Sequence, residues 1–462
     1  MAHLTHWRSQ LKRGLLVNSV LAQALRPEAI EGPCRALGHT WRDSFWNPVT
    51  TLLTFLFQVL SAEKTLRAGV ADLLAQLAAI GRTDLPSPDP TAYCQARRRL
   101  PGQALVGLLG FIVEQMKTLP APSTLWLGRR VWIGDGTTVS MPDEPELQKA
   151  FPQPPGQKKG CGFPVARIVA LFCWATGAVI DLAIDSLHAH ELPLFRKLWS
   201  HFRPGEVVVD DRACCSYVDI AKLLARGVFG VFHLHQQRQA DFRVGKRLGR
   251  DDQRVTWRRP ERWIESMGVS LQEFERLPET MTVRLVRITQ VPKGFRSRTM
   301  VLVTTLLDPI ETPADQIRAL YRDRWMVELN LRSIKTHLGM DVLRGQSLDV
   351  VGKEIVMHLV AYNLIRLLMW HAARAHGRNL HRLSFTGTLH RLRDVFPLVL
   401  RARTGAEKQR LAAQLLQWIA DHRVPDRPNR FEPRRRKRRP KEYSLLNQPR
   451  RWYHLHGDPH AR

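Results

Sequence analysis

The first part of the chain, up to about residue 125, carries apolar side chains at helical spacing, in blocks separated by proline and glycine. Pro48 and Pro90 suit the first turn of a helix, and Gly81 suits a helix end. The predicted helices span about residues 47–60, 62–80, 89–99 and 103–117. A bundle of this kind is either a DNA-binding module or a helical cap on the next domain, because no segment has a clear helix-turn-helix pattern.

The pattern changes at about Arg129, where alternating and wholly apolar runs predict β-strands. The predicted strands lie at about 129–141, 166–175, 177–186, 206–211 and 227–235, with helices at 191–200 and 218–225. The run Val207–Val209 is wholly apolar, as expected of a central strand that is covered on both faces. The order β, β, β, α, β, α, β therefore predicts a mixed sheet with flanking helices.

Residues 236–309 interrupt this order, because they are polar, basic and strand-like, and they predict a β-rich insertion. A charged helix at 313–338 and a strongly apolar helix at 349–375 then complete the predicted core. Two further predicted helices, at 384–399 and 407–421, precede a basic tail.

The predicted helix from Pro313 to Leu338 has an informative arrangement of polar side chains. Thr312 and Asp315 are expected to form a capping box at its start, and Gly339 is expected to end it. At about 100° per residue, four polar side chains fall within an arc of about 60° beside an apolar stripe. These four are Tyr321, Arg324, Glu328 and Lys335. The cations suit phosphates, and they favour the ionised form of the carboxylate between them. A solvated amphipathic helix with i,i+4 ion pairs would give the same pattern.

The net charge of the chain indicates which class of molecule it binds. The chain has 70 lysines and arginines against 42 acidic residues, a net charge of +28 and a pI near 10.8. This charge indicates a polyanion, with nucleic acid preferred over an anionic membrane. No membrane is expected as a partner, since the apolar runs at 168–180 and 355–370 are too short or too interrupted by charge. The six cysteines have no paired CxxC spacing and the N-terminus lacks a signal-peptide apolar region, so a reduced cytoplasmic setting is expected.

Two clusters of arginine are candidate phosphate contacts. Arg97 and Arg98 end a predicted helix, and Arg434, Arg435 and Arg436 belong to the basic tail. For the tail, a flexible arm that binds phosphates is favoured over a merely solvated segment because the whole chain is so basic.

Three carboxylates are candidate metal ligands. Asp135 lies in the first predicted strand, Asp211 ends the apolar central strand, and Glu328 lies on the late helix. Carboxylates at strand ends meet at one edge of a sheet, and oxygen ligands of this kind suit Mg²⁺ or Mn²⁺. Taken singly, Asp135 is also explained as a turn residue and Asp211 as a partner in an ion pair. The histidine-containing segment 188–193 is interpreted as a loop at a helix start rather than as a metal site.

These residues carry a family resemblance. The spacing Tyr321, Arg324, Glu328, Lys335 resembles the signature of the DDE transposases of insertion-sequence family four. The segment IGDGTTVSMPD is similar to that family's first acidic motif at Asp135, and VVVDDRACCSY is similar to the second. Asp211 is preferred over Asp210 for the second acid because it directly precedes an arginine. The resemblance covers nearly the whole chain.

The resemblance implies a fold and a domain order. It implies an α/β ribonuclease-H-like core at residues 126–235 and 310–375, with a mixed sheet and flanking helices, interrupted by the β-rich insertion at 236–309. An N-terminal helical, DNA-binding domain at 1–125 would precede the core. A helical and basic C-terminal region at 376–462 would follow it.

The resemblance also implies a chemistry. Asp135, Asp211 and Glu328 would hold two Mg²⁺ ions, for which Mn²⁺ can substitute. Tyr321, Arg324 and Lys335 would bind phosphates, and Trp257 would stack on a flipped base, with Trp263 behind it. The DNA partners would be the terminal inverted repeats and the target, and two ends imply a homodimer on DNA.

Some alternatives stay open at this point. Either tryptophan is also explained as a core residue. Another ribonuclease-H-like nuclease, or a non-enzymatic DNA-binding protein derived from a transposase, is the competing function.

The charge predicts salt-sensitive DNA binding. We expect the association constant for the terminal repeats to fall linearly with salt on a log–log plot, with a slope of about −0.9 per phosphate neutralised. Fluorescence anisotropy between 50 and 300 mM salt, as rough limits for such a titration, measures the slope. A nearly flat dependence would contradict the charge argument.

Overall fold

The structure is a computed structural model, and it describes residues 26–42, 44–290, 298–402, 404–425 and 448–456. The chain divides into two compact units. The helical unit contains Met1–Leu119, Thr138–Ala166 and Arg332–Arg462, and the sheet unit contains Pro120–Thr137 and Arg167–Leu331.

The helical unit is built around a long apolar helix, α14 (Leu348–Ala375), against which helices from both ends of the chain pack. The other helices are α3 (Pro27–Ala36), α4 (Pro48–Leu60), α5 (Leu66–Ala79), α6 (Thr91–Arg99), α7 (Gly102–Thr118), α8 (Pro145–Ala150), α15 (Phe385–Arg401), α16 (Gly405–Asp421) and α17 (Arg450–His456). Within the described residues, α14 alone has the length and composition to cross a membrane, but 83% of its most apolar window is buried. Burial of this extent is typical of the core helix of a globular unit.

The predicted start of α4 is confirmed by its cap, whereas the helix predicted from about residue 62 begins at Leu66. The Asn47 side chain accepts a hydrogen bond from the Thr50 amide at 3.1 Å, with Pro48 in the first turn. Three α-helices of this unit were not predicted: α3, the six-residue α8 and α17. Proline and glycine inside or around these short segments hide their helical periodicity.

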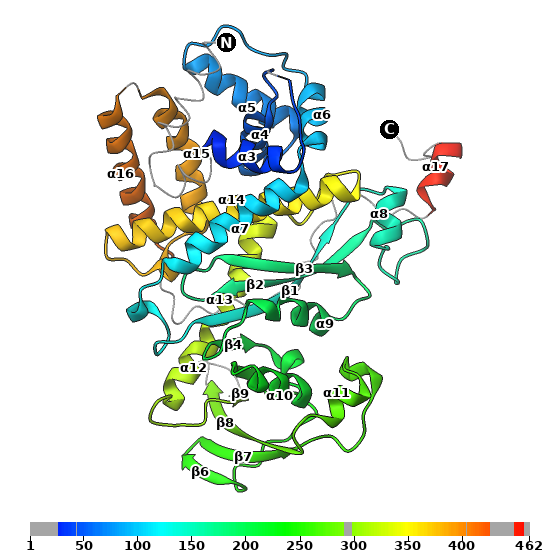
Figure 1. The fold of residues 1–462 in the computed structure, drawn as a ribbon, viewed down its shortest axis with the longest axis vertical. Helices are drawn as coiled ribbons and strands as arrows, with labels where there is room; N and C mark the ends of the chain where they lie inside the picture. The colour runs from blue at the N-terminus through cyan, green and yellow to red at the C-terminus, as the bar shows by residue number, and fades with distance from the viewer. Residues whose placement is uncertain (1–25, 43, 291–297, 403, 426–447, 457–462) are drawn as a thin grey trace. The chain divides into compact units, whose positions relative to one another are not determined.

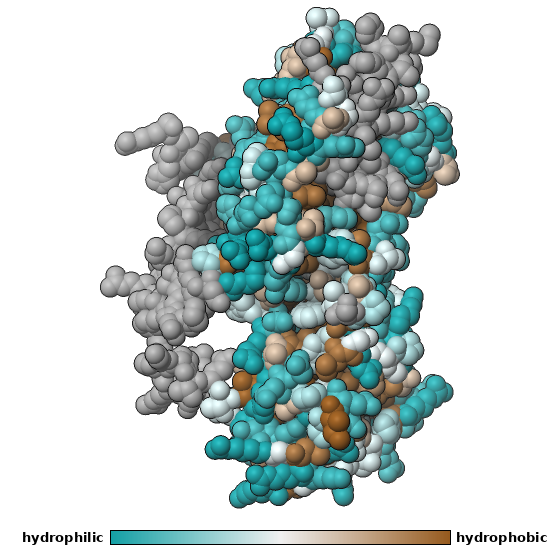
Figure 2. Space-filling model, turned by 90° about the vertical axis from the view of Figure 1, so that its left-hand side faces the viewer, coloured by the Kyte–Doolittle hydropathy of each residue, from teal (hydrophilic) through white to brown (hydrophobic). Residues whose placement is uncertain are grey.

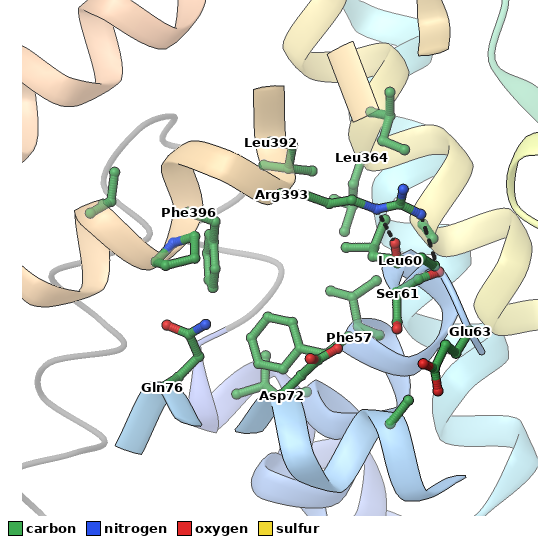
Figure 3. Close-up of a pocket in the computed structure, with 18 of the residues that line it drawn as sticks. Phe57, Leu60, Ser61, Glu63, Asp72, Gln76, Leu364, Leu392, Arg393 and Phe396 are labelled. Carbon is green, nitrogen blue, oxygen red and sulfur yellow. Dashed lines mark hydrogen bonds between the residues drawn. The ribbon is translucent and has the colours of Figure 1, made fainter. Parts of the chain in front are cut away.

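Arg393 ties α15 to the end of α4 within the helical unit. Its guanidinium donates hydrogen bonds to the carbonyl oxygens of Leu60 and Ser61 at the end of α4, where helix carbonyls lack partners within the helix. It does so at the edge of an apolar cavity of about 520 Å³, across which the rings of Phe57 and Phe396 lie 5.4 Å apart (Figure 3).

A nine-stranded mixed sheet carries the predicted strands, in the order β3-β2-β1-β4-β5-β9-β8-β7-β6 (Figure 1). The strands are β1 (Val131–Ser140), β2 (Val165–Cys173), β3 (Val179–Ser186), β4 (Val207–Asp210), β5 (Phe229–His233), β6 (Lys246–Gly249), β7 (Asp252–Arg258), β8 (Thr280–Gln290) and β9 (Arg298–Thr304). β1, β4 and β5 are parallel, whereas β9 runs antiparallel to β5. β4, whose run Val207–Val209 is wholly apolar, is central and buried, as that run predicts.

The sheet unit also contains short helices besides η1 (Pro122–Thr124). They are α9 (Glu191–Lys197), η2 (Leu198–His201), η3 (Arg212–Cys214), α10 (Tyr217–Ala225), η4 (Glu265–Met267) and α11 (Leu271–Glu275). The strands β6–β9 lie within residues 236–309, where strands were predicted. They extend the sheet beyond β5 rather than forming a separate one. The helices η4 and α11 in this region were not predicted.

The predicted helix 313–338 is present but divided. It forms α12 (Ala314–Asp323), α13 (Trp325–Arg332) and a π-helical turn, η5 (Ser333–His337). Gly339 ends it with φ +78°, as predicted. The predicted Thr312 capping box is wrong, because Pro313 is the N-cap residue and Asp315 pairs with Arg318 at 2.7 Å.

A buried ion pair lies next to Thr312, just before α12. Arg284 on β8 is fully buried and donates to both carboxylate oxygens of Asp252 on β7, at 2.8 and 2.5 Å. Its third nitrogen, Nη1, donates to the carbonyl oxygen of Thr312 at 2.7 Å. Thr312 is buried just before α12. Arg284 therefore joins strands β7 and β8 to the start of that helix.

This pair predicts a large loss of stability on truncation. Arg284→Ala leaves the Asp252 carboxylate buried without its partner, and we expect the free energy of unfolding to fall by about 3–5 kcal/mol. Urea unfolding followed by tryptophan fluorescence measures it. The control is Arg243→Ala, which breaks an exposed pair with Asp241 and should leave the free energy of unfolding nearly unchanged. Equal losses in the two variants would refute the structural role of Arg284.

Candidate active site

The pairing of β1 with β4 sets the position of two aspartates. Ile133 lies opposite Val209 in this parallel pair, so two residues further on Asp135 lies opposite Asp211. Residues that are level in adjacent parallel strands point to the same face of a sheet. Asp135 lies inside β1, and Asp211 follows β4 directly and caps η3, where its Oδ1 accepts the Ala213 amide at 2.7 Å.

The third acid comes from α13. Glu328 accepts a hydrogen bond from Arg324 Nη2 at 3.3 Å, and the Arg324 guanidinium lies 5.9 Å from the centre of the Tyr321 ring. The charges of both Glu328 and Asp211 act on Asp135, as does that of Arg324. The structure therefore brings these five residues, from three separate segments of the chain, into one electrostatic cluster within the sheet unit.

Burial controls the protonation of this cluster. The pKa of Asp135 is raised to about 6, mainly by burial. Arg324 and the Gly136 amide, which donates to Asp135 at 2.9 Å, oppose the shift, whereas Glu328 and Asp211 add to it. Burial also raises the pKa of Tyr321 to about 12, so its hydroxyl stays protonated and able to donate.

The donor set fits a divalent cation. Asp135, Asp211 and Glu328 present carboxylate oxygens, which Mg²⁺ and Mn²⁺ prefer. Glu328 and Asp211 add to the effect of burial on the pKa of Asp135, and a bound dication would relieve this repulsion.

Asp210 differs from its neighbour. It is buried, and a Cβ built on Gly134 would lie 2.7 Å from its Oδ2. Asp210 thus shares a face with Gly134, opposite to the face of Asp135 and Asp211. Burial raises the pKa of Asp210 well above its usual range. Among the described residues, Asp210, Asp211 and Cys214 have possible ligand atoms within 4.8 Å of one another, whereas Asp135, Asp211 and Glu328 do not form such a group in this structure.

The other predicted DNA-binding residues differ in burial and in the unit to which they belong. Arg97 is buried, with its guanidinium 4.9 Å from the centre of the Phe55 ring, whereas Arg98 is exposed. Lys335 lies in η5, which belongs to the helical unit, so its place in the site stays a prediction. Arg434, Arg435 and Arg436 lie outside the described residues.

The two candidate tryptophans are not core residues. Trp257 is half-buried on β7, and the Arg238 guanidinium stacks 4.1 Å from the centre of its ring. Trp263 is 36% exposed, and its Nε1 donates to the Val269 carbonyl at 2.9 Å. Trp257 therefore belongs to a cation–π pair in the region added beyond β5.

A basic groove next to Asp211 was not found from the sequence. It has a volume of about 710 Å³ and begins at Arg212, directly after the aspartate. Its cationic and aromatic lining includes Arg212, His233, His235, Arg238, Phe242, Arg250 and Arg287. The basic character of residues 235–250 was the feature of the sequence that could have indicated this groove. Only the folded strands show that these cations lie in one groove. Hydrophilic residues also cover most of the face drawn in Figure 2.

Comparison with known proteins indicates the family of the chain. The family described as "Transposase DDE domain" matches residues 126–364, which is 239 of the 462 residues. Over 367 residues, 78% of each protein, the chain is 25% identical to "Transposase InsG for insertion sequence element IS4" of Escherichia coli (strain K12). Over 84 residues, 18% of this chain and 22% of the relative, it is 34% identical to "Putative transposase y4zB" of Sinorhizobium fredii.

The mixed sheet with its flanking helices fits the ribonuclease-H-like fold expected of such proteins. The resemblance carried by Tyr321, Arg324 and Glu328 is confirmed at the level of the family. With the family matched over more than half of its length, the chain belongs to the DDE transposases, of the insertion-sequence-four type.

Proposed function

We propose that the protein binds the terminal inverted repeats of an insertion sequence, cleaves the DNA at those ends and joins the 3′-hydroxyl strands to target DNA. The observation that carries the proposal is the electrostatic cluster of Asp135, Asp211 and Glu328 beside Arg324. Cleavage and strand transfer at a phosphodiester develop negative charge on the attacking and leaving oxygens. Bound divalent cations stabilise this charge, and a cluster of carboxylates can bind such cations.

Asp135, Asp211 and Glu328 would hold two divalent cations, Mg²⁺ or Mn²⁺. When bound, such a pair supplies Lewis-acid activation of the attacking oxygen and stabilisation of the leaving oxygen. The protein's own contribution is to fix three carboxylates on rigid elements, two on adjacent strands and one on a helix.

Arg324 and Tyr321 would bind the phosphate next to the cleaved bond. Arg324 hydrogen-bonds Glu328 in this structure and is partly buried, which makes it a preorganised donor for a phosphate oxygen. Tyr321 remains a neutral hydroxyl donor because of its raised pKa. Lys335 would complete the phosphate contacts, as the family signature implies.

The DNA would extend from this site over basic surfaces. The groove beginning at Arg212 and the Arg238–Trp257 pair would contact the strand near the cleaved end, with Trp257 available for a base. Arg98 and the tail residues Arg434–Arg436 would add contacts outside the core, and Arg97 is left out because it is buried. The helical residues 1–125 would bind the repeats, and a homodimer would hold the two ends together.

Replacing the helix-borne acid tests the chemistry. Glu328→Gln should lower the rate of Mg²⁺-dependent nicking at the terminal repeats by at least about 10²–10³-fold, because one metal ligand loses its charge. Repeat binding should stay nearly intact. Glu275→Gln, at an exposed glutamate at the end of α11, is the matched control and should cleave as the wild type does.

Nicking is measured on labelled repeat DNA, and binding by gel shift. Cleavage retained in Glu328→Gln would reject its role as a metal ligand.

The raised pKa of Asp135 predicts a pH-dependent response to metal. Because its folded pKa of about 6 lies above the usual value, this group favours the folded state at acidic pH, and that contribution is lost as the pH rises through 6. Metal needs the ionised form, so Mn²⁺ should raise the melting temperature more at about pH 7.5 than at about pH 5.

Thermal unfolding of the whole chain with and without Mn²⁺ measures this. Asp135→Asn should abolish most of the Mn²⁺-induced increase at both pH values. An increase that is equal at both pH values in the wild type would contradict the assignment.

A further inference from the structure

Asp210 makes contacts that the proposed chemistry does not use. It is the last residue of β4 and pairs with Phe232 of β5, so the ladder between these strands ends there. Its side chain is buried, and its Oδ1 accepts the backbone N–H of the next residue, Asp211, at 2.7 Å. A carboxyl group therefore fixes the peptide from which the metal-facing aspartate extends.

The surroundings of Asp210 are shaped for this contact. A Cβ on Gly134 would lie 2.7 Å from Oδ2 of Asp210 and 2.6 Å from the Phe195 ring, so glycine is required opposite it on β1. Possible ligand atoms of Cys214 and Asp210 also lie within 4.8 Å of each other. Cys214 belongs to η3, the same short helix that Asp211 caps through its own Oδ1.

We propose that Asp210 is a positioning residue, which holds the Asp211 backbone and η3 so that the second carboxylate oxygen of Asp211 faces the divalent cations. This role rests on the proposed function. Asp211 stands just past the last ladder pair, where backbone hydrogen bonds of the sheet no longer restrain it. Outer residues that orient a ligand commonly change metal affinity by about 10–100-fold when they are removed.

The contact needs an acceptor, not a charge. Asp210→Asn keeps a side-chain oxygen that can accept the Asp211 amide, whereas Asp210→Ala removes it. Asp210→Leu also removes it but keeps a similar volume, so it remains informative if the alanine variant does not fold. A residue that only filled space would be replaced as well by leucine as by asparagine.

The matched control is Asp219→Asn. Asp219 is another buried aspartate of the sheet unit, on α10, and it pairs with Arg196 at 2.7 Å. Its replacement tests whether weakening any buried aspartate changes metal binding. Asp211→Asn tests the ligand itself.

Mn²⁺ binding to the full chain, measured by isothermal titration calorimetry at about pH 7.5 and by electron paramagnetic resonance of free Mn²⁺, is the readout. Asp210→Ala and Asp210→Leu should raise the dissociation constant by at least about tenfold, and Asp210→Asn by less than about threefold. Asp219→Asn should leave it within about twofold. The Mg²⁺ concentration that half-saturates nicking should shift in parallel.

The outcomes separate the two proposals. Wild-type binding in Asp210→Ala and Asp210→Leu, or loss of binding in Asp210→Asn equal to that in Asp211→Asn, would overturn the positioning role. In the second case Asp210 would itself be a ligand. Failure of the wild type to bind Mn²⁺, or undiminished binding in Asp211→Asn, would overturn the proposed site and the positioning role with it.

Discussion

Parallel pairing of β1 with β4 in one particular register underlies the candidate site. With Val131 opposite Val207, the two aspartates that follow these apolar runs come level with each other. A shift of one residue in this pairing would move Asp135 to the other face, because side chains alternate along a strand. The register is secured by the apolar residues of both strands, which are almost completely buried. Hydrophobic burial, rather than attraction between the acids, therefore brings the like charges together.

Like charges held together by packing need compensation. Arg324 supplies part of it, since it hydrogen-bonds Glu328 and lowers the pKa of Asp135. The compensation is incomplete, because burial and the other two acids still leave the Asp135 pKa at about 6. A site of this kind stores unfavourable electrostatic energy that a cation releases on binding, and this couples metal occupancy to the stability of the fold.

Much of the sheet could be predicted because its strands are apolar or alternating and are bounded by turn residues. The two aspartates were found for the same reason, as polar residues at or near the ends of apolar runs. The turn at Arg324 and the π-helical segment beyond Arg332 could not be predicted, since a wheel assumes one uniform period. In the run Arg97–Arg99, the sequence does not show that Arg97 points inward toward Phe55, because that depends on tertiary packing.

The buried Arg284 joins three segments, through Asp252 on β7, its own strand β8 and the carbonyl of Thr312 before α12. The strands inserted into the core are thus anchored to the helix that leads to Glu328. Exchange of this insertion between related enzymes would have to carry a matching guanidinium and carboxylate, along with a chain turn that offers its carbonyl at the junction. We therefore expect the insertion to be exchangeable only between enzymes that have this arginine, this carboxylate and this backbone carbonyl at the same junction.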